Sequence, residues 1–419
     1  MKRFSLTLMA LSLVAASFLS LAGCAQLSGP ATLVVAQNKP EIDGALKAYA
    51  AAWGTTTNTT VTVKTVGGGG NDLGTELKAA YAAGDMPDIF IIAGPDDVKQ
   101  WGNILADLSG EPWVSKTSLA YKEAGKVIGF PVAVEGWGMA YNNDILKKAG
   151  IDASTLTNLA AYKAAFEKLD SMKAELGLNS VVSMAASTGM GWVTAHHNVN
   201  SYLSNGLPYG DLSVAEMALT GKLDAQRFSE YADWVELLFK YADKAVLTTG
   251  NYDDQVGAFA SQKAAFLHQG NWVDPNMKSA NATFEMAYAP HGSSAKVTDG
   301  IFVSAPSWYV INKESKNVAA AKKFLADLAG TDAGAKFMVE DAGMIPAFSN
   351  ITLKPAGALS KSVQAYSNAG KVYSWNQYML PNSFRDQNLA PIYNQFAMGS
   401  IDKATFIQLF TAAVATLKM

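Results

Sequence analysis

The stretch PDIFII (Pro87–Ile92) is apolar after its first two residues and predicts a β-strand. Going back along the chain, Thr75–Ala83 predicts a helix, and VTVKTV (Val61–Val66) predicts a second strand. Before these, Glu41–Trp53 is rich in alanine with apolar residues near helical spacing, and TLVVA (Thr32–Ala36) predicts a strand. Strands that alternate with helices are typical of βαβ units, so the sequence predicts an α/β fold with a mostly parallel sheet.

The same alternation begins again after Tyr141 and continues to the end of the chain. Within Leu159–Gly177, apolar residues at three- and four-residue steps predict one helix face: Tyr162, Phe166, Leu169, Met172 and Leu176. The other predicted elements are helices Asn142–Gly150, Phe228–Ala242, Val318–Ala329 and Lys403–Lys418, and strands Ser180–Ala186, Ala264–Leu267 and Trp308–Asn312. The chain is therefore predicted to be α/β throughout, in two lobes.

The start of the chain has the layout of a secretory signal peptide. Lys2 and Arg3 give a positive start, an apolar run (Phe4–Ser20) follows, and small residues precede Cys24. A transmembrane helix is the alternative, since about 17–20 apolar residues can just span a bilayer. Charged flanks would then be expected where small residues and a cysteine stand. Cys24 is the only cysteine, so an internal disulfide is excluded.

The composition is that of an ordinary globular protein. The chain has 419 residues, of which 49% are hydrophobic and 16% are charged. That length leaves room for roughly two to three domains. The formal net charge of −3 argues against a nucleic-acid partner, which requires basic patches.

Four stretches follow one another in a characteristic order. They are GDMPDIFII (Gly84–Ile92), GKVIGFPVAVEGWGMAYNNDILKKAGID (Gly125–Asp152), SQKAAFLHQGNW (Ser261–Trp272) and WYVINKESKNVAAAKKFLADL (Trp308–Leu328). Together they resemble the extracellular sugar-binding proteins of ABC importers, the maltose-binding-protein group. In addition, LAGC (Leu21–Cys24) resembles the lipobox of bacterial lipoproteins. In those proteins the thiol of the cysteine receives a diacylglycerol thioether, and the chain is cleaved before the cysteine, which becomes the new N-terminus. The attached fatty acyl chains, such as palmitate, anchor the protein.

The resemblance implies two α/β lobes of the periplasmic-binding-protein-like type, joined by a hinge. The crossings between lobes are expected near Ala133–Gly136, Phe302–Ser307 and Met344–Asn350. The resulting boundaries are a signal peptide at 1–23, a lipid-anchored tether at 24–30, an N-terminal lobe at 31–134 plus 308–345, and a C-terminal lobe at 135–307 plus 346–419.

The resemblance also implies a function. The lobes are expected to close on a carbohydrate, an oligosaccharide, and to present it to the permease subunits of an ABC importer. The lipid on Cys24 would hold a monomer to the cell membrane, on its extracellular or periplasmic face. No enzymatic activity, cofactor or metal is expected.

Tryptophans are the first candidate ligand residues, because a pyranose offers apolar faces that stack on flat aromatic rings. Several of the nine tryptophans lie beside glycines or amides, where backbone and ring can approach a ligand closely. Trp272 matches the stacking tryptophan of the family, and Trp375 lies where relatives place another ring. Trp137 and Trp192 are further candidates, whereas Trp234 within a predicted helix favours packing.

Polar candidates follow the predicted strands. Glu135 aligns with the acidic residue at the family's crossover, where a carboxylate accepts strong hydrogen bonds from hydroxyls. Asp96 and Asn38 each follow a strand at its carboxyl end, where ligands bind in open α/β sheets. Asp96 has a helix N-cap as its alternative role. Asn71 and Asn271 complete the predicted ligand set.

Other classes of protein have weaker support. A glycosidase needs two carboxylates about 5–10 Å apart, and Glu135 and Asp96 are the candidate pair for this alternative. No G-x-S-x-G or P-loop is present, and the single S-x-x-K (Ser293–Lys296) lacks its companion motifs. His196 and His197 are adjacent, which on a helix turns their side chains about 100° apart and argues against a shared metal. A binding protein for a non-sugar solute, such as a polyamine, is the remaining alternative.

Overall fold

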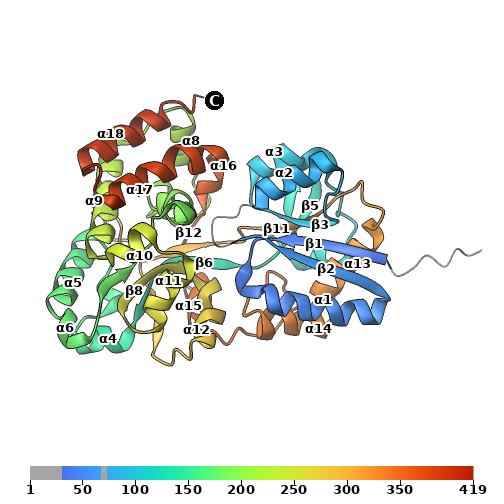
Figure 1. Cartoon of the computed structure of the whole chain (residues 1–419), viewed down its shortest axis with the longest axis horizontal. Helices are drawn as coiled ribbons and strands as arrows, with labels where there is room; N and C mark the ends of the chain where they lie inside the picture. The colour runs from blue at the N-terminus through green and yellow to red at the C-terminus, as the bar shows by residue number, and fades with distance from the viewer. Residues whose placement is uncertain (1–30, 68–72, 419) are drawn as a thin grey trace, which may run out of the picture.

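The computed structural model describes residues 31–67 and 73–418, and they form two lobes, each built on its own six-stranded sheet (Figure 1). The predicted signal peptide, the predicted lipidation site Cys24 and the candidate residue Asn71 lie outside the described residues. In the described part of the chain no helix has both the length and the apolar character needed to cross a bilayer. The fold is therefore mixed α/β and two-lobed, as predicted.

The first lobe contains a sheet with the strand order β2-β1-β3-β11-β5-β4. Its strands are β1 (Ala31–Gln37), β2 (Thr59–Thr65), β3 (Ile89–Ile92), β4 (Tyr121–Glu123), β5 (Lys126–Pro131) and β11 (Trp308–Ile311). Its helices are η1 (Pro40–Ile42), α1 (Asp43–Thr57), α2 (Leu73–Ala83), α3 (Pro95–Trp101), η2 (Gly102–Ile104), η3 (Pro112–Lys116), α13 (Val318–Gly330), α14 (Asp332–Lys336) and η8 (Phe337–Asp341).

Helix α1 continues past its predicted end at Trp53. The hydroxyls of Thr56 and Thr57 both donate to the backbone carbonyl of Trp53 at 2.8 Å, so both side chains find their hydrogen-bond acceptor within the helix. The helix ends at Asn58, whose φ of 51° is left-handed and closes it. The polar run therefore completes a helix rather than forming a loop.

The prediction of a mostly parallel sheet is wrong. β1 runs parallel to β2 and β3, as the βαβ pattern requires. β11, however, returns from the other lobe and pairs antiparallel with both β3 and β5. In the second lobe β6 is antiparallel to β8, β9 and β10. Strands that enter a sheet from the opposite lobe run against their neighbours, and local periodicity does not report this.

The second lobe contains a sheet with the order β12-β10-β6-β8-β7, and β9 also pairs with β6. Its strands are β6 (Glu135–Asn142), β7 (Ser180–Ser183), β8 (Ala264–Gly270), β9 (Met286–Ala289), β10 (Ile301–Ser304) and β12 (Val372–Tyr373). Its helices up to β8 are α4 (Asn143–Lys148), η4 (Ala153–Thr155), α5 (Leu159–Ser171), α6 (Lys173–Leu176), η5 (Thr188–Met190), η6 (Trp192–Asn198), α7 (Val199–Ser204), α8 (Ser213–Leu219), α9 (Ala225–Tyr241), α10 (Lys244–Thr249) and α11 (Tyr252–Ala260). Those after β8 are η7 (Asn271–Val273), α12 (Asp274–Ser279), α15 (Ala358–Asn368), η9 (Asn376–Met379), α16 (Asn382–Phe384), η10 (Arg385–Leu389), α17 (Ala390–Met398) and α18 (Lys403–Val414).

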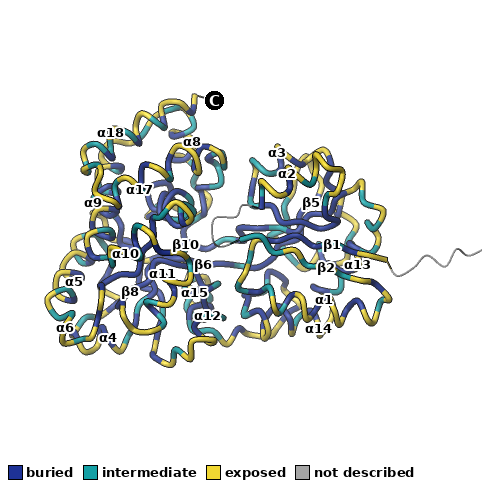
Figure 2. The backbone as a smooth tube through the Cα atoms, viewed as in Figure 1, coloured by how far each residue is buried: buried dark blue, intermediate teal, exposed yellow. Residues whose placement is uncertain are grey.

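The cores follow the predicted apolar faces. Tyr162, Phe166 and Leu169 of α5 are fully buried in the second lobe, which confirms the first three residues of the predicted stripe. The predicted single helix is divided, because α5 ends at Ser171, and Met172 and Leu176 are only partly buried. Trp234 of α9 is fully buried in the same core, and its Nε1 donates to Asn198 Oδ1 at 3.2 Å. Figure 2 shows the buried residues gathered on the two sheets and the exposed ones on the outer helix faces.

The chain passes between the two sheets three times. β5 leads into β6 through 132–134, and β10 leads into β11 through 305–307. The third passage lies between η8 and α15, and it pairs with the first through an antiparallel bridge between Val134 and Ile345. The first passage contacts both others, since the backbone N–H of Val132 donates to the backbone carbonyl of Ser307 at 3.1 Å and Val134 is bridged to Ile345, so the passages form one junction between the lobes.

Candidate functional site

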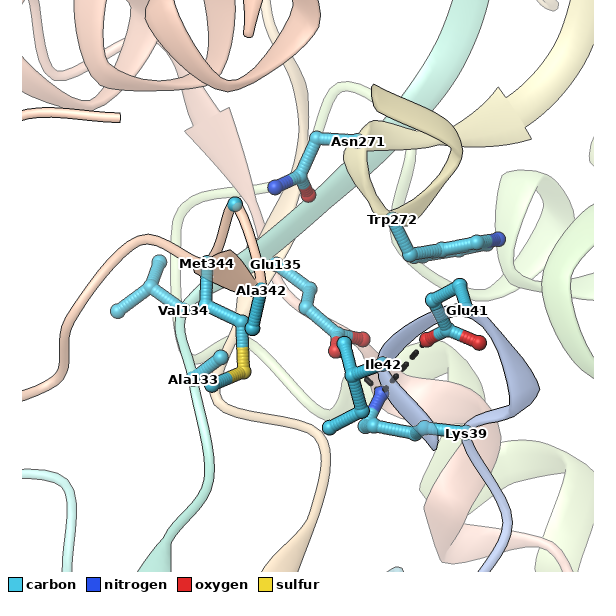
Figure 3. Close-up of a pocket in the computed structure, with 11 residues that line it drawn as sticks. Lys39, Glu41, Ile42, Ala133, Val134, Glu135, Asn271, Trp272, Ala342 and Met344 are labelled. Atoms are coloured by element: carbon cyan, nitrogen blue, oxygen red, sulfur yellow. Dashed lines mark hydrogen bonds and ion pairs between the residues drawn. The ribbon is translucent and has the colours of Figure 1, made fainter. Parts of the chain in front are cut away.

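A pocket lies between the lobes beside this junction, and Figure 3 shows the side chains around it. In this conformation it has room for water-sized molecules of only about 10 Å³. Four segments line it: Lys39, Glu41 and Ile42 after β1, Ala133–Glu135 at the first passage, Asn271 and Trp272 after β8, and Ala342–Met344 at the third passage. Both lobes and two of the passages therefore contribute to one hollow.

Three charged side chains meet in this pocket. Lys39 Nζ donates to Glu135 Oε1 and lies 4.0 Å from Glu41 Oε1 (Figure 3). The side chains of Lys39, Glu135 and Glu41 are only 12%, 9% and 8% exposed. Because Lys39 belongs to the first lobe and Glu135 begins β6 of the second, their ion pair joins the two lobes.

Burial changes the protonation of this group. Desolvation raises the pKa of Glu41 to about 7, against the opposing attraction of Lys39. Burial alone would lower the pKa of Lys39, but the carboxylates of Glu135 and Glu41 outweigh it and the pKa is raised. Lys39 therefore stays an ammonium ion at neutral pH, while Glu41 changes its charge there.

The indole of Trp272 forms one wall of the pocket. Its ring is partly exposed, and its Nε1 donates to Gln269 Oε1 at 3.0 Å. A Cβ added to Gly270 would lie 2.0 Å from Cζ3 of this ring, so the indole occupies the space that a side chain at Gly270 would fill. The Gly-Asn-Trp order thus lets the ring fold back over the end of β8.

Trp192, Trp272 and Trp375 converge on one imidazole. Their ring centroids lie 5.4, 5.1 and 5.4 Å from that of His197. Trp375 is also stacked with Tyr378, at 6.1 Å and an interplanar angle of 18°. The ring of Trp137 lies 5.6 Å from the same imidazole, so the structure brings all four predicted tryptophans together around His197. The sequence had singled out His197 only as half of an adjacent histidine pair.

Trp137 was predicted as a ligand residue, but its side chain does not line the pocket. Its side chain is 0% exposed, and its ring stacks on Phe302 at 4.2 Å and 21°. Trp137 on β6 and Phe302 on β10 are direct cross-strand partners, which places both rings on one face of the sheet. Gly136 serves the opposite face of the sheet, because a Cβ there would lie 2.6 Å from Val363 of α15.

Two of the predicted polar residues have other surroundings. Asn271 lines the pocket, but both ends of its amide are used: Oδ1 accepts from the Gly136 backbone N–H at 2.8 Å, and Nδ2 donates to Ser360 Oγ at 3.0 Å. Asn38 does not line the pocket, whereas its neighbour Lys39 does. The sequence therefore located the loop after β1 and missed the residue that points inward.

Asp96 lies at a second contact between the lobes. Its Oδ2 accepts from the backbone N–H of Asn382 at 3.0 Å, and Asp97 Oδ1 accepts from Asn382 Nδ2 at 2.8 Å. Helix α3 begins at Pro95, so the alternative role of Asp96 as its N-cap is wrong. This cross-lobe contact holds the start of α3 against α16.

The arrangement suits a neutral, hydroxyl-rich ligand with apolar faces. Indole rings supply flat apolar surface, and a few fixed polar groups supply hydrogen bonds, which is the usual make-up of a small-molecule pocket. Among residues 31–67 and 73–418, no three or more His, Cys, Asp or Glu side chains are grouped to hold a metal ion.

Comparison with known proteins gives a consistent result. A family model described as bacterial extracellular solute-binding protein matches residues 36–342. The chain is 22% identical over 301 residues to the melibiose/raffinose/stachyose-binding protein MelE of Bacillus subtilis, covering 67% of this chain and 66% of MelE. It is 28% identical over 275 residues to the maltodextrin-binding protein MdxE of the same organism, covering 63% and 61%. The matches thus span less than two thirds of each of these relatives.

Solved structures share the fold. The solute-binding protein RafE in complex with raffinose superposes with a TM-score of 0.75 at 16% identity, covering 93% of this chain and 100% of RafE. A sugar transporter of Bacillus licheniformis in complex with stachyose gives 0.72 at 17% identity, covering 92% and 100%.

Proposed function

The chain belongs to the family of bacterial extracellular solute-binding proteins, and we propose that it binds an oligosaccharide between its lobes and delivers it to an ABC importer. Relatives whose names state a sugar ligand support this proposal. The proposed partners are the oligosaccharide and the permease subunits of the importer, and the proposed role is capture without chemistry.

The observation that carries the proposal is the indole wall beside buried hydrogen-bonding groups. Trp272 lines the pocket, and Trp375 and Trp192 lie next to it around His197. Glu135 offers carboxylate oxygens to hydroxyl groups within the same pocket. Apolar sugar faces and a hydroxyl rim match these two kinds of surface.

Closure of the lobes is the proposed mechanism. The present pocket has room for water-sized molecules of only about 10 Å³, far below the usual range of roughly 300–1,000 Å³ for ligand pockets. An oligosaccharide therefore needs the lobes to rotate apart about the three passages, as rigid bodies centred on the two sheets. A ligand that touches both lobes then stabilises the closed form by its higher affinity for that form.

The location is proposed to be the outer face of the cell membrane, with a monomer anchored through acylated Cys24. Two acyl chains anchor a protein stably where one does not. The anchor is tested by the variant Cys24→Ser, which is expected in the soluble fraction, while the unaltered chain sediments with membranes. Equal membrane fractions for both proteins would remove the anchor from the proposal.

The binding role is tested by calorimetry with raffinose, stachyose and a maltodextrin. The unaltered protein is expected to bind at least one of them, and Trp272→Ala to bind it at least tenfold more weakly, because the ring face is lost. Trp101→Phe, at a buried ring of the first lobe outside the pocket, is the matched control and should keep the affinity. An unaltered protein that binds none of the three sugars would contradict the proposed ligand class.

A glycosidase is the second candidate, and one observation favours it. Glu41, with its pKa raised to about 7, resembles a proton donor, and Glu135 also contacts Lys39. Against it, the ammonium of Lys39 pairs with both carboxylates, where the glycosidic oxygen would have to lie. Reducing sugar released from stachyose or maltodextrin, and lost in Glu41→Gln, would establish this activity in place of pure binding.

A further inference from the structure

His197 is the point at which the aromatic side chains of the pocket region meet. Besides the three rings around it, Trp137 stacks on it at 5.6 Å and 21°. The imidazole thus touches four indoles that come from β6, η6, η7 and the segment before η9. No other side chain of the described residues has ring contacts to four tryptophans.

The backbone that carries His197 has an unusual conformation. Residues Trp192–Asn198 form a π-helix, and a second π-helix, Arg385–Leu389, packs beside it. His196 Nε2 lies 2.6 Å from Asp386 Oδ1 and links the two. π-Helical turns are rare in proteins, and those that occur are often found at functional sites. The pair of π-helices therefore fixes the backbone from which the His197 ring projects.

The ring nitrogens of His197 are available to a ligand. The residue is partly exposed, and within the described residues no hydrogen bond to either nitrogen is formed. The other histidine on this π-helix, His196, has its carboxylate partner. In a wall of indoles, His197 is thus a polar group with both hydrogen-bonding positions unused.

The imidazole is neutral at physiological pH. Burial lowers the pKa of His197 well below its ordinary value, and the charged or titratable groups that act on it are His196, His268, Arg385 and Lys39. All of these are bases, so the surroundings disfavour a further positive charge. A neutral imidazole offers one N–H donor and one acceptor nitrogen.

We propose that His197 is a sugar-contacting residue that binds a pair of hydroxyl groups, one as acceptor and one as donor, while the partly exposed indoles of Trp192 and Trp272 pack on the sugar face. The inference rests on the proposed function and deepens it: the ligand must present two adjacent hydroxyls beside an apolar ring face. A sugar lacking one of these hydroxyls leaves a ring nitrogen unpaired in the closed pocket, and such sites discriminate strongly against the deoxy analogue.

Three variants separate this role from packing. His197→Phe keeps an aromatic ring for the indoles and removes both nitrogens, whereas His197→Asn keeps a donor and an acceptor and removes the ring. A contact role predicts that calorimetry with stachyose and raffinose gives at least tenfold weaker binding for the Phe variant and a smaller loss for the Asn variant. A packing role predicts the reverse order. Trp101→Phe, at the buried first-lobe ring outside the pocket, is the control and should bind within about threefold of the unaltered protein.

Nitrogen-15 spectra of the histidine rings in the unaltered protein give a readout that needs no variant. On saturation with stachyose, the two His197 ring nitrogens are expected to shift, because each gains a hydrogen bond. Unchanged His197 signals, or full affinity in His197→Phe, would overturn the inference and leave sugar binding standing. Absence of binding by the unaltered protein to stachyose, raffinose and maltodextrin would overturn the proposed function, and the inference with it.

Discussion

Replacing Gly270 by alanine should move one indole ring and leave the backbone in place. Gly270 has φ −102° and ψ 176°, which any L-residue adopts without strain. The new Cβ, however, would lie 2.0 Å from Cζ3 and 2.3 Å from Cη2 of Trp272. Ordinary carbon contacts begin at 3.4 Å, so the indole must move by about 1.4 Å.

The cost of this movement comes from two interactions of the indole that the movement breaks. The hydrogen bond from Trp272 Nε1 to Gln269 Oε1, 3.0 Å long, contributes about 0.5–1.5 kcal/mol net. The ring pair with His197 contributes about 0.5–1.5 kcal/mol more. We therefore expect the free energy of unfolding to fall by about 1–3 kcal/mol, and stachyose to bind at least tenfold more weakly, about 1.4 kcal/mol.

Urea unfolding and calorimetry measure these two effects. The matched control is Gly257→Ala in α11, where a new Cβ meets nothing within 4 Å. That variant should bind stachyose as the unaltered protein does and gain about 0.5–1 kcal/mol of stability, because alanine favours a helix. If Gly270→Ala unfolds and binds like the unaltered protein, Trp272 neither depends on this glycine nor forms a wall of the ligand site.

Three further predictions concern other parts of the molecule. Burial lowers the pKa of His268 to about 4, below the value of about 6.5 in the unfolded chain, so the unfolded state binds more protons between these values and stability is lost as the pH falls. Urea unfolding should show a loss of about 2 kcal/mol in the free energy of unfolding between pH 7 and pH 5, and His268→Gln should abolish this contribution. An equal pH dependence of stability in both proteins would contradict this prediction. Asn382→Ala removes the hydrogen bond to Asp97 that joins the two lobes, so the lobes should separate more often. Small-angle scattering of the unliganded variant should therefore show a larger radius of gyration. A scattering profile identical to that of the unaltered protein would exclude a role for this contact in closure. Trp234→Ala should lower the free energy of unfolding by about 3–5 kcal/mol, since the ring is fully buried, and a loss below about 1 kcal/mol would contradict its place in the core.

Much of the fold could be predicted from short stretches of sequence. β1, β2 and β3 lie where their apolar runs predicted strands, and α5 buries three of the five residues of the predicted stripe. The direction of the strands could not be predicted, since β11 and β6 reach their sheets from the opposite lobe and run against their neighbours. Local periodicity reports which face of an element is buried, and it carries no information on the direction from which the chain arrives.

The candidate site was predicted in part. Trp272, Glu135 and Asn271 do line the pocket, and Trp375 lies beside it. Trp137 has the same glycine-flanked sequence as a ligand tryptophan but lies opposite Phe302 in the sheet. The signal of a glycine beside a tryptophan is the same whether the ring approaches a ligand or another strand, so the sequence cannot distinguish the two.

The sequence by itself determined the elements, their order along the chain and the residue types available for a ligand, because each of these depends on close neighbours in the chain. Only the tertiary structure decided that Lys39 meets Glu135 and that four indoles surround His197. These groups come from segments far apart in the chain, and they meet through the packing of two lobes across one junction. The π-helix that carries His197 lies against the second π-helix, and that contact exists only once the second lobe has folded.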